Sequence, residues 1–236
     1  MGNAEFDLIS RIHSRARSRP DVVLGIGDDA ALLQVPPDQQ LVVTADTLNA
    51  GVHFPDTTAP ADIGWKALAV NLSDLAAMGA SPAWCTLSLS LPNADDAWVD
   101  QFLDGFMALA DRHGIALVGG DTTRGPLSIS VAAMGLVEAG CALRRDTAQV
   151  GDDVWVTGML GDAAMALEAV LQAREVSPAM RERLDRPAPR VAVGQRLSGL
   201  VHACIDVSDG VLADLGHVCE RSGVGAEIHM SDLPCS

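Results

Sequence analysis

Apolar and polar residues follow two different periods along this chain, and the period changes at short turns rich in glycine and aspartate. Apolar residues recur every three to four positions in 5–17, 60–78 and 94–113, which predicts three helices. Short apolar or alternating runs at 40–45, 84–91, 116–118 and 128–136 predict strands. The first half of the chain is therefore expected to form a sheet with helices packed on it.

The composition shifts toward Arg, Asp and Gly near residues 140–152, and we expect a domain boundary there. This divides the chain into an N-terminal domain, 1–140, and a C-terminal domain, 141–236. In the second domain the pattern predicts strands at 153–157, 203–207 and 226–229 and helices at 162–174, 190–200 and 210–221. Strands and helices do not alternate strictly, which favours a mixed α/β or α+β architecture over a doubly wound sheet.

Composition narrows the classes of partner. The hydrophobic fraction of 48% argues against disorder, and the formal net charge of −15 disfavours binding to nucleic acid or anionic lipid. The sequence has no uninterrupted apolar run of about 18 residues, so no membrane span is predicted. The five cysteines form no Cys-x-x-Cys pair, which is typical of a reduced cytoplasmic protein.

Several well-known catalytic motifs are missing. Lys66 is the only lysine and follows Trp65, so neither a Walker A loop nor a protein-kinase strand lysine exists. The turn at Gly25 and Gly27 lacks the third glycine of a dinucleotide-binding loop. Neither a Gly-x-Ser-x-Gly elbow nor a zinc-binding spacing of His and Cys occurs.

What recurs instead is an aspartate at a strand end or in a glycine turn, within an acidic set of 24 Asp against 7 Glu. The instances are Gly27-Asp28-Asp29, Thr44-Ala45-Asp46-Thr47, Asn71-Leu72-Ser73-Asp74, Gly119-Gly120-Asp121-Thr122-Thr123 and Asp206-Val207-Ser208-Asp209-Gly210. Strand ends would place such carboxylates at one edge of a sheet, where hard oxygen ligands suit several Mg²⁺ ions and the phosphates of ATP. An aspartate beside glycine is more often simple turn chemistry, and Asp209 also fits a helix N-cap. Asp74 differs because it lies in an apolar helical stretch, where a buried carboxylate needs a partner such as a cation.

These motifs resemble the thiamine-monophosphate kinase family along essentially the whole chain. The resemblance rests on Glu5-Phe6-x-Leu8-Ile9, on Gly25 to Leu33, on Thr44 to Thr47, on Lys66 to Ala80, on Gly119 to Pro126 and on Asp206 to Gly210. It implies an aminoimidazole ribonucleotide synthetase (PurM)-like two-domain fold, with an N-terminal mixed-sheet dimerisation domain and an α+β C-terminal domain. It also implies a cytoplasmic homodimer that transfers the γ-phosphoryl group of ATP to thiamine monophosphate, directly and in line, with several Mg²⁺ ions.

Carried over position by position, the resemblance implies roles for individual residues. Its Mg²⁺ ligands correspond to Asp29, Thr44, Ala45 through its backbone oxygen, Asp46, Asp74, Asp121, Asp206 and Asp209. Its ATP contacts correspond to Gly120, Asp121, Arg145 and Ser208, and a substrate contact corresponds to His53. Taken alone, His53 fits a surface-loop histidine better, and Arg144-Arg145 fits a solvated basic pair as well as a phosphate fork. No general base is expected, because the attacking group is already a phosphate oxygen anion.

The sequence departs from the family after the last shared motif. The family continues past the position of Ser236 with a Gly-Gly-Glu-Asp-Tyr-like motif and a late aromatic residue near the thiamine part, whereas this chain contains no Tyr. We therefore expect a C-terminally truncated chain with an incomplete second domain. Two alternatives stay open: another ATP-using enzyme of the superfamily with a different acceptor, or a non-catalytic fragment that binds Mg²⁺ and nucleotide.

Overall fold

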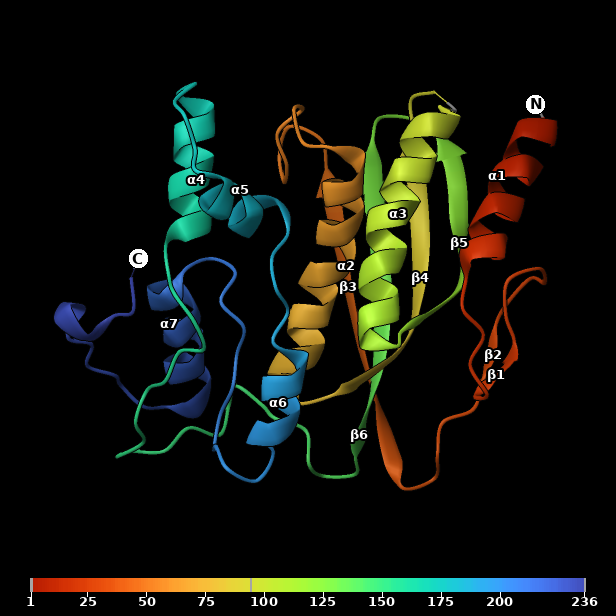
Figure 1. Cartoon of the computed structure of the whole chain (residues 1–236). Coiled ribbons are helices and arrows are strands. Elements are labelled where there is room, and N and C mark those ends of the chain that lie inside the picture. The colour runs from red at the N-terminus through yellow and green to blue at the C-terminus, as the bar shows by residue number, and fades with distance from the viewer. Residues whose placement is uncertain (1, 94, 236) are drawn as a thin grey trace.

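The computed structural model describes residues 2–93 and 95–235 and contains one four-stranded mixed sheet with helices on one face (Figure 1). The N-terminal half runs α1 (Gly2–Arg15), β1 (Val22–Leu24), β2 (Leu32–Leu33), β3 (Gln39–Asn49), α2 (Pro60–Ala77), β4 (Ser81–Leu91), α3 (Asp96–His113), β5 (Ala116–Arg124) and β6 (Ser128–Glu138). The strand order is β3-β6-β4-β5, and only β4 and β5 are parallel. The mixed sheet expected from the sequence is confirmed.

Helices α2 and α3 form where the periodicity predicts them, and local chemistry sets their ends. Pro60 occupies the first turn of α2, where its missing N–H costs no hydrogen bond. The Asp95 side chain caps α3 by accepting from the backbone N–H groups of residues 97 and 98, and Gly114 ends it in the left-handed conformation. The predicted start at residue 94 lies outside the described residues.

The two helices touch backbone to backbone at two glycines. A Cβ atom on Gly64 would stand 2.0 Å from the carbonyl oxygen of Phe102, and one on Gly105 would stand 1.7 Å from that of Ala61. No other residue type fits at either position without moving a helix. The glycines therefore allow α2 and α3 to lie unusually close and to cover the sheet as one layer.

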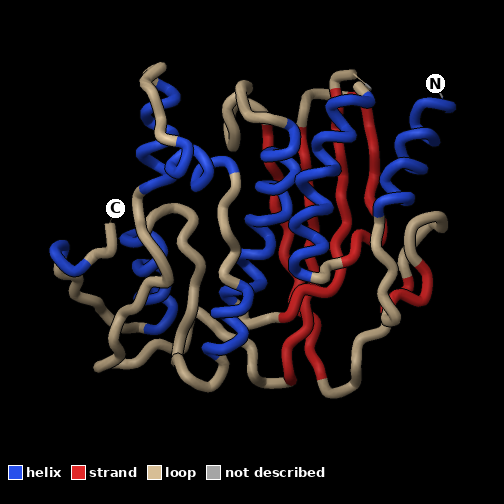
Figure 2. The backbone as a smooth tube through the Cα atoms, in the orientation of Figure 1, coloured by secondary structure: helices blue, strands red, loops and turns tan. Residues whose placement is uncertain are grey.

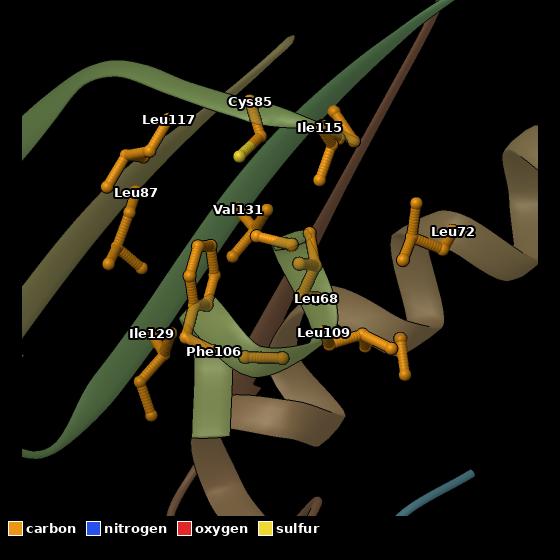
Figure 3. Packing of buried hydrophobic residues seen from close by; sticks show 14 of the residues in the cluster. Leu68, Leu72, Cys85, Leu87, Phe106, Leu109, Ile115, Leu117, Ile129 and Val131 are labelled. Carbon is orange, nitrogen blue, oxygen red and sulfur yellow. The ribbon is translucent and has the colours of Figure 1, made fainter. Parts of the chain in front are cut away.

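The main core lies between this helix layer and the sheet. Figure 3 shows Leu68 and Leu72 of α2 and Phe106 and Leu109 of α3 packing against strand residues such as Val131, and all of them are buried. On β3, even-numbered residues point toward the helices, while Leu41 and Val43 on the other face are 45% and 60% exposed. The β1–β2 hairpin covers part of that other face around the buried Trp84.

A polar cluster fastens the hairpin segment to the sheet. Arg19 donates two hydrogen bonds to the carboxylate of Asp21, at 3.0 and 2.7 Å, and the indole Nε1–H of Trp84 donates to the same carboxylate at 3.1 Å. The bonds from Arg19 outweigh burial and hold the pKa of Asp21 below its ordinary value of 3.8. A depressed folded-state pKa means that this cluster stabilises the fold above that pH and loses the contribution as the pH falls.

We expect Asp21→Asn to lower the free energy of unfolding by about 1 kcal/mol at pH 7, because the charge-assisted bonds from Arg19 are lost. The difference from wild type should begin to shrink as the pH falls below 3.8 and should be lost as the pH passes through the lower folded-state pKa, where the wild-type carboxylate becomes protonated. Urea midpoints at pH 7 and pH 3 measure both effects. Asp111→Asn, which breaks an exposed ion pair with Arg17, is the control and should have little effect. A difference that persists undiminished at pH 3 would contradict this account.

The C-terminal half contains α4 (Asp162–Leu171), α5 (Pro178–Asp185), α6 (Val191–Leu197), α7 (Val211–Ser222) and a short 3-10 turn, Met230–Asp232. Figure 2 shows it as helices joined by long loops, and in Figure 1 it lies beside α2, with α6 next to the C-terminal end of that helix. A Cβ atom on Gly194 of α6 would stand 2.0 Å from the carbonyl oxygen of Ala76, so this contact is also backbone to backbone.

The strands predicted at 153–157, 203–207 and 226–229 are wrong. These segments have no ladder partner among the described residues; the only pairing after β6 there is an isolated bridge between Leu160 and Cys235. Their apolar alternation favours extended backbone, but a strand also needs a neighbour to accept its hydrogen bonds. Val154 and Trp155 are accordingly 54% and 86% exposed. Helix α5 lies in a segment for which no element was predicted.

No helix in the described part of the chain is both long enough and apolar enough to cross a membrane.

Candidate phosphate and metal site

The candidate site begins with one hydrogen bond between the sheet and helix α2. Thr44 lies on the helix-facing side of β3, and its hydroxyl donates to the carboxylate of Asp74 on α2 at 2.5 Å. Asp74 lies on the same helix as the fully buried Leu72 and Leu75, which fix the orientation of that helix. Because the apolar residues of α2 pack on the sheet, the Asp74 carboxylate lies beside the face of β3 that bears Thr44.

A second carboxylate arrives from the C-terminal half. Asp206 accepts a hydrogen bond from the hydroxyl of Ser73 at 2.9 Å, which joins the segment before α7 to α2. Asp206 also interacts electrostatically with Asp46 of β3 and with Asp74. Three aspartates from three distant segments therefore come together at the junction of the two halves.

Burial raises the pKa of each of these carboxyl groups. For Asp46 the neighbouring charge of Asp206 adds to the rise and His53 opposes it. For Asp74 the bond from Thr44 opposes the rise, the charge of Asp46 adds to it, and Arg145 lowers the pKa. For Asp206 the bond from Ser73 opposes burial, while Asp74 and Asp214 add to it. The cause is shared: carboxylates are crowded and partly desolvated without enough cationic charge nearby.

A cleft of about 540 Å³ opens beside these residues. It is lined by Val42, Val43, Thr44, Asp74, Ala77, Met78, Arg144, Arg145, Asp146, Cys204, Ile205, Asp206 and Arg221. Arg144 is occupied by the carboxylate of Asp146, with bonds of 2.7 and 2.5 Å, whereas the side chain of Arg145 makes no hydrogen bond or ion pair with any described residue. Arg145 is therefore available to an anionic ligand in the cleft, as is Arg221, which also lines it and makes no side-chain hydrogen bond or ion pair with a described residue.

The acidic residues fit divalent cations by chemistry but do not enclose an ion by themselves. Carboxylates and hydroxyls are the hard oxygen donors that Mg²⁺ prefers. In the described part of the chain, however, no three His, Cys, Asp or Glu side chains converge closely enough to form a metal-binding group. Mg²⁺ usually keeps several waters and takes other ligands from substrate phosphates, so one or two carboxylates per ion are sufficient.

The structure separates other predicted residues from this cluster. Asp121 and Gly120 lie on β5, which is the sheet edge opposite to β3 and thus three inter-strand spacings away, about 14 Å. Thr47 registers with Ser130, Ser130 with Ser88, and Ser88 with Asp121, so Asp121 lies level with the end of β3 along the strands, and its separation from Thr44 is across the sheet. Asp29 is exposed in the turn between β1 and β2, and Ala45 is exposed on the sheet face away from Thr44. No described contact links either residue to Asp74.

The turn before α7 is organised by a residue that the sequence reasoning missed. Asp214 is 4% exposed, and its carboxylate accepts from the backbone N–H groups of Ser208, Asp209 and Gly210 at 3.0 to 3.2 Å. Asp209 is therefore held by the cap and is not the cap itself, and its side chain is exposed. An Asp in the first turn of a predicted helix, just after Asp-Gly, is the signal that could have revealed this role.

His53 lies in the turn that follows β3. Its ring Nδ1 accepts the backbone N–H of Asn49 at 3.0 Å, and the ring lies within electrostatic reach of the carboxyl group of Asp46. The ring is exposed in a surface turn, as the surface-loop interpretation expected, and this hydrogen bond holds it in place. The structure thus brings together Thr44, Asp46, Asp74, Asp206, Arg145 and His53.

Comparison with known proteins identifies the relatives of this arrangement. Residues 27–137 match the family model of the AIR synthase related protein N-terminal domain, and residues 149–236 match that of its C-terminal domain. Thiamine-monophosphate kinase of Escherichia coli (strain K12) is 50% identical over 243 residues, which cover 100% of this chain and 74% of the relative. These matches confirm the aminoimidazole ribonucleotide synthetase-like fold class.

Two solved structures extend the comparison. The crystal structure of thiamine-monophosphate kinase from Stenotrophomonas maltophilia K279a aligns with a TM-score of 0.91 at 61% identity, covering 99% of this chain and 77% of that one. A structure described as AaThiL complexed with AMPPCP and TMP aligns with a TM-score of 0.75 at 35% identity, covering 92% of this chain and 69% of that one.

Proposed function

Because this chain belongs to the thiamine-monophosphate kinase family, we propose that it transfers the γ-phosphoryl group of ATP to thiamine monophosphate and forms thiamine diphosphate. The bond from the γ-phosphorus to the bridging oxygen of ADP breaks, and a bond to a phosphate oxygen of thiamine monophosphate forms. The relative solved with AMPPCP and TMP binds an ATP analogue, which supports ATP as the co-substrate. Among the alternatives, a different phosphoryl acceptor is the one to test.

The observation that carries this proposal is the gathering of Asp46, Asp74 and Asp206 beside the cleft that Arg145 lines. Burial, with a further contribution from the neighbouring carboxylates, raises the pKa of all three carboxyl groups, so they gain stabilisation from an added cation. Bound Mg²⁺ would neutralise negative charge on the phosphates of ATP. Hydrogen bonds from Thr44 and Ser73 keep two of the carboxylates in place before any ligand arrives.

We assign the remaining roles by family position and local chemistry. The proposed Mg²⁺ ligands are Asp29, Thr44, the backbone oxygen of Ala45, Asp46, Asp74, Asp121, Asp206 and Asp209, and the proposed ATP contacts are Gly120, Asp121, Arg145 and Ser208. His53 is the proposed contact to thiamine monophosphate. No side chain needs to remove a proton, because the acceptor oxygen is already anionic. The residues of the chain bind and orient the two substrates and neutralise the charge on their phosphates.

Arg145 gives a specific prediction for nucleotide affinity. We expect Arg145→Met to raise the KM for ATP by about tenfold or more, because a charge-assisted bond to a phosphate is lost. The matched control is Arg144→Met at the adjacent position, where the guanidinium is already paired with Asp146. Its KM for ATP should stay within about threefold of wild type. Equal effects of the two substitutions would contradict the assignment of Arg145.

We also propose a homodimer in which the partner copy supplies Asp121 and Gly120. Strand β3 lies at an open edge of the sheet, with Leu41 and Val43 exposed on the face that α2 and α3 leave uncovered. Because Asp121 lies at the opposite sheet edge from Thr44, one copy of the chain does not bring it to Asp74. A second copy docked along the open β3 edge is a route by which its Asp121 could reach the site.

Mixing two inactive variants tests the shared site. A heterodimer of Asp74→Asn and Asp121→Asn would contain one site with both substitutions and one intact site. Equal mixing after dissociation and reassociation should restore about a quarter of wild-type activity. No recovery, with mixed dimers shown by mass spectrometry, would place both residues of each site in the same copy. A chain that sediments as a monomer at assay concentration would contradict the dimer itself.

The proposed setting is the cytoplasm, where thiols stay reduced. All five cysteines are unpaired in the structure, which is compatible with such an environment.

The direct test of the function is formation of thiamine diphosphate by the 236-residue chain with ATP, thiamine monophosphate and Mg²⁺, compared with the same mixture containing EDTA. Product that depends on Mg²⁺ supports the kinase. ATP consumption only with other phosphorylated acceptors would favour another enzyme of the superfamily. Nucleotide binding by a folded chain without turnover of any acceptor would favour the non-catalytic alternative.

A further inference from the structure

His53 is held from two sides, and among the described residues Lys66 is the one whose side chain anchors it. The backbone N–H of His53 donates to the carbonyl of Asn49 at 3.0 Å, and the backbone N–H of Asn49 donates to the His53 ring at 3.0 Å. The ammonium group of Lys66 donates to the backbone carbonyl of His53 at 3.0 Å. Since Nδ1 is the acceptor, the proton of the neutral ring is on Nε2, which leaves a donor free for a ligand.

Lys66 connects this turn to the C-terminal half of the chain. It is partly buried on α2, burial lowers its pKa, and the Asp185 carboxylate on α5 opposes that shift while Arg181 adds to it. Asp185 is 5% exposed, and Arg181 donates to its Oδ2. The other oxygen, Oδ1, is buried and accepts no hydrogen bond from a described residue. A buried carboxylate with a spare acceptor thus lies within electrostatic reach of the only lysine in the chain.

We propose that Lys66 is a positioning residue for the phosphoryl acceptor, and that Asp185 stabilises its ammonium group. Lys66 holds the carbonyl of His53, so the turn keeps the free Nε2–H donor beside the acidic cluster. In this way α5 influences the placement of a residue that belongs to the N-terminal half. The proposal rests on the proposed function, because it takes thiamine monophosphate as the molecule that His53 contacts.

Steady-state kinetics separate this role from a general structural one. Lys66→Met keeps the length of the side chain but removes its charge and donors. We expect it to raise the KM for thiamine monophosphate about tenfold, with kcat and the KM for ATP within about twofold of wild type. Lys66→Arg restores a charged donor, and most of the affinity should return. Unchanged KM values, or equal rises for both substrates, would overturn the proposal.

Asp185→Asn provides a second variant that leaves Lys66 intact. It should raise the KM for thiamine monophosphate about threefold without changing the KM for ATP, because the ammonium group loses its nearby charge. Glu182→Gln, at an exposed position of the same helix, is the matched control and should behave as wild type. An Asp185→Asn enzyme with wild-type kinetics would remove α5 from the proposal.

A spectroscopic readout keeps the test independent of turnover. In a protein with ¹⁵N-labelled histidine, the His53 signals are identified by their loss in His53→Gln, and wild type should show an Nε2–H tautomer with Nδ1 as acceptor. Lys66→Met should abolish that preference, and its persistence would overturn the positioning role. If wild type forms no thiamine diphosphate while the tautomer is as expected, the kinase assignment fails. Lys66 would then still position His53, but thiamine monophosphate would not be the molecule that His53 contacts.

Discussion

Asp74→Asn is expected to lower kcat/KM for thiamine diphosphate formation by about 10²- to 10³-fold. Asp74 accepts the hydroxyl of Thr44, acts on the charges of Asp46 and Asp206, and lines the cleft. An amide at this position can still accept that bond, but it cannot balance a cation. The substitution therefore removes charge from the centre of the cluster while leaving its packing in place.

Mg²⁺-dependent binding is the measurement that isolates this effect. Titration calorimetry with ATP and Mg²⁺ should give a large loss of affinity for Asp74→Asn, and the urea midpoint without ligand should be equal to or above that of wild type. The sign follows from burial, which raises the pKa of Asp74 and so makes its charged form unfavourable in the folded state. Asp38→Asn, at an exposed position before β3, is the control. Normal Mg²⁺-ATP binding by Asp74→Asn would exclude Asp74 as a metal ligand.

Gly105→Ala is the second substitution with a large expected effect, and it acts on stability alone. The added Cβ would stand 1.7 Å from the backbone oxygen of Ala61, so α2 and α3 must move apart to admit it. We expect the free energy of unfolding to fall by about 3 kcal/mol. For a chain of this size the melting temperature should fall by about 6–12 °C.

Gly216→Ala is the matched control for that experiment. Gly216 lies in α7, and a Cβ atom there would meet nothing within 4 Å. The same Gly→Ala change in an open helical position should be neutral or should stabilise the protein by up to about 1 kcal/mol. If both variants melt at the wild-type temperature, the close contact between α2 and α3 does not control the stability of the fold.

The sequence predicted the elements whose residues carry a long and regular period. Helices α2 and α3 and strands β3 to β6 lie close to their expected places because many apolar positions report the same period. The β1–β2 hairpin was missed because strands of three and two residues contain no period to read. Helix α5 was missed because its segment, Pro178–Asp185, is mostly polar. The strands expected at 153–157, 203–207 and 226–229 failed because periodicity reports backbone shape, whereas a sheet also requires a partner.

The sequence predicted which residues form the site better than it predicted how these residues are arranged in space. The sequence singled out Asp74 from the conflict between one carboxylate and its apolar neighbours, and the structure pairs it with Thr44. It gave no means of knowing that β5 lies at the far edge from β3, because strand order depends on how the crossovers pack. Lys66 was noted as the lone lysine and as the first residue of a shared motif, with no role of its own. Its contact with His53 joins residues 13 positions apart through a turn whose shape no pattern predicts.

The position of Lys66 and Asp74 on one helix constrains how this chain could change in length over evolution. The two residues are eight positions apart on α2, which corresponds to about 12 Å along the helix axis. One residue inserted between them would turn Asp74 by about 100° relative to Lys66 and shift it by about 1.5 Å, since each helical residue contributes that rotation and rise. Natural insertions and deletions should therefore be absent from this stretch of related sequences and tolerated in the loop between α4 and α5. An insertion between the positions of Lys66 and Asp74 would thus mark a related sequence that has lost function.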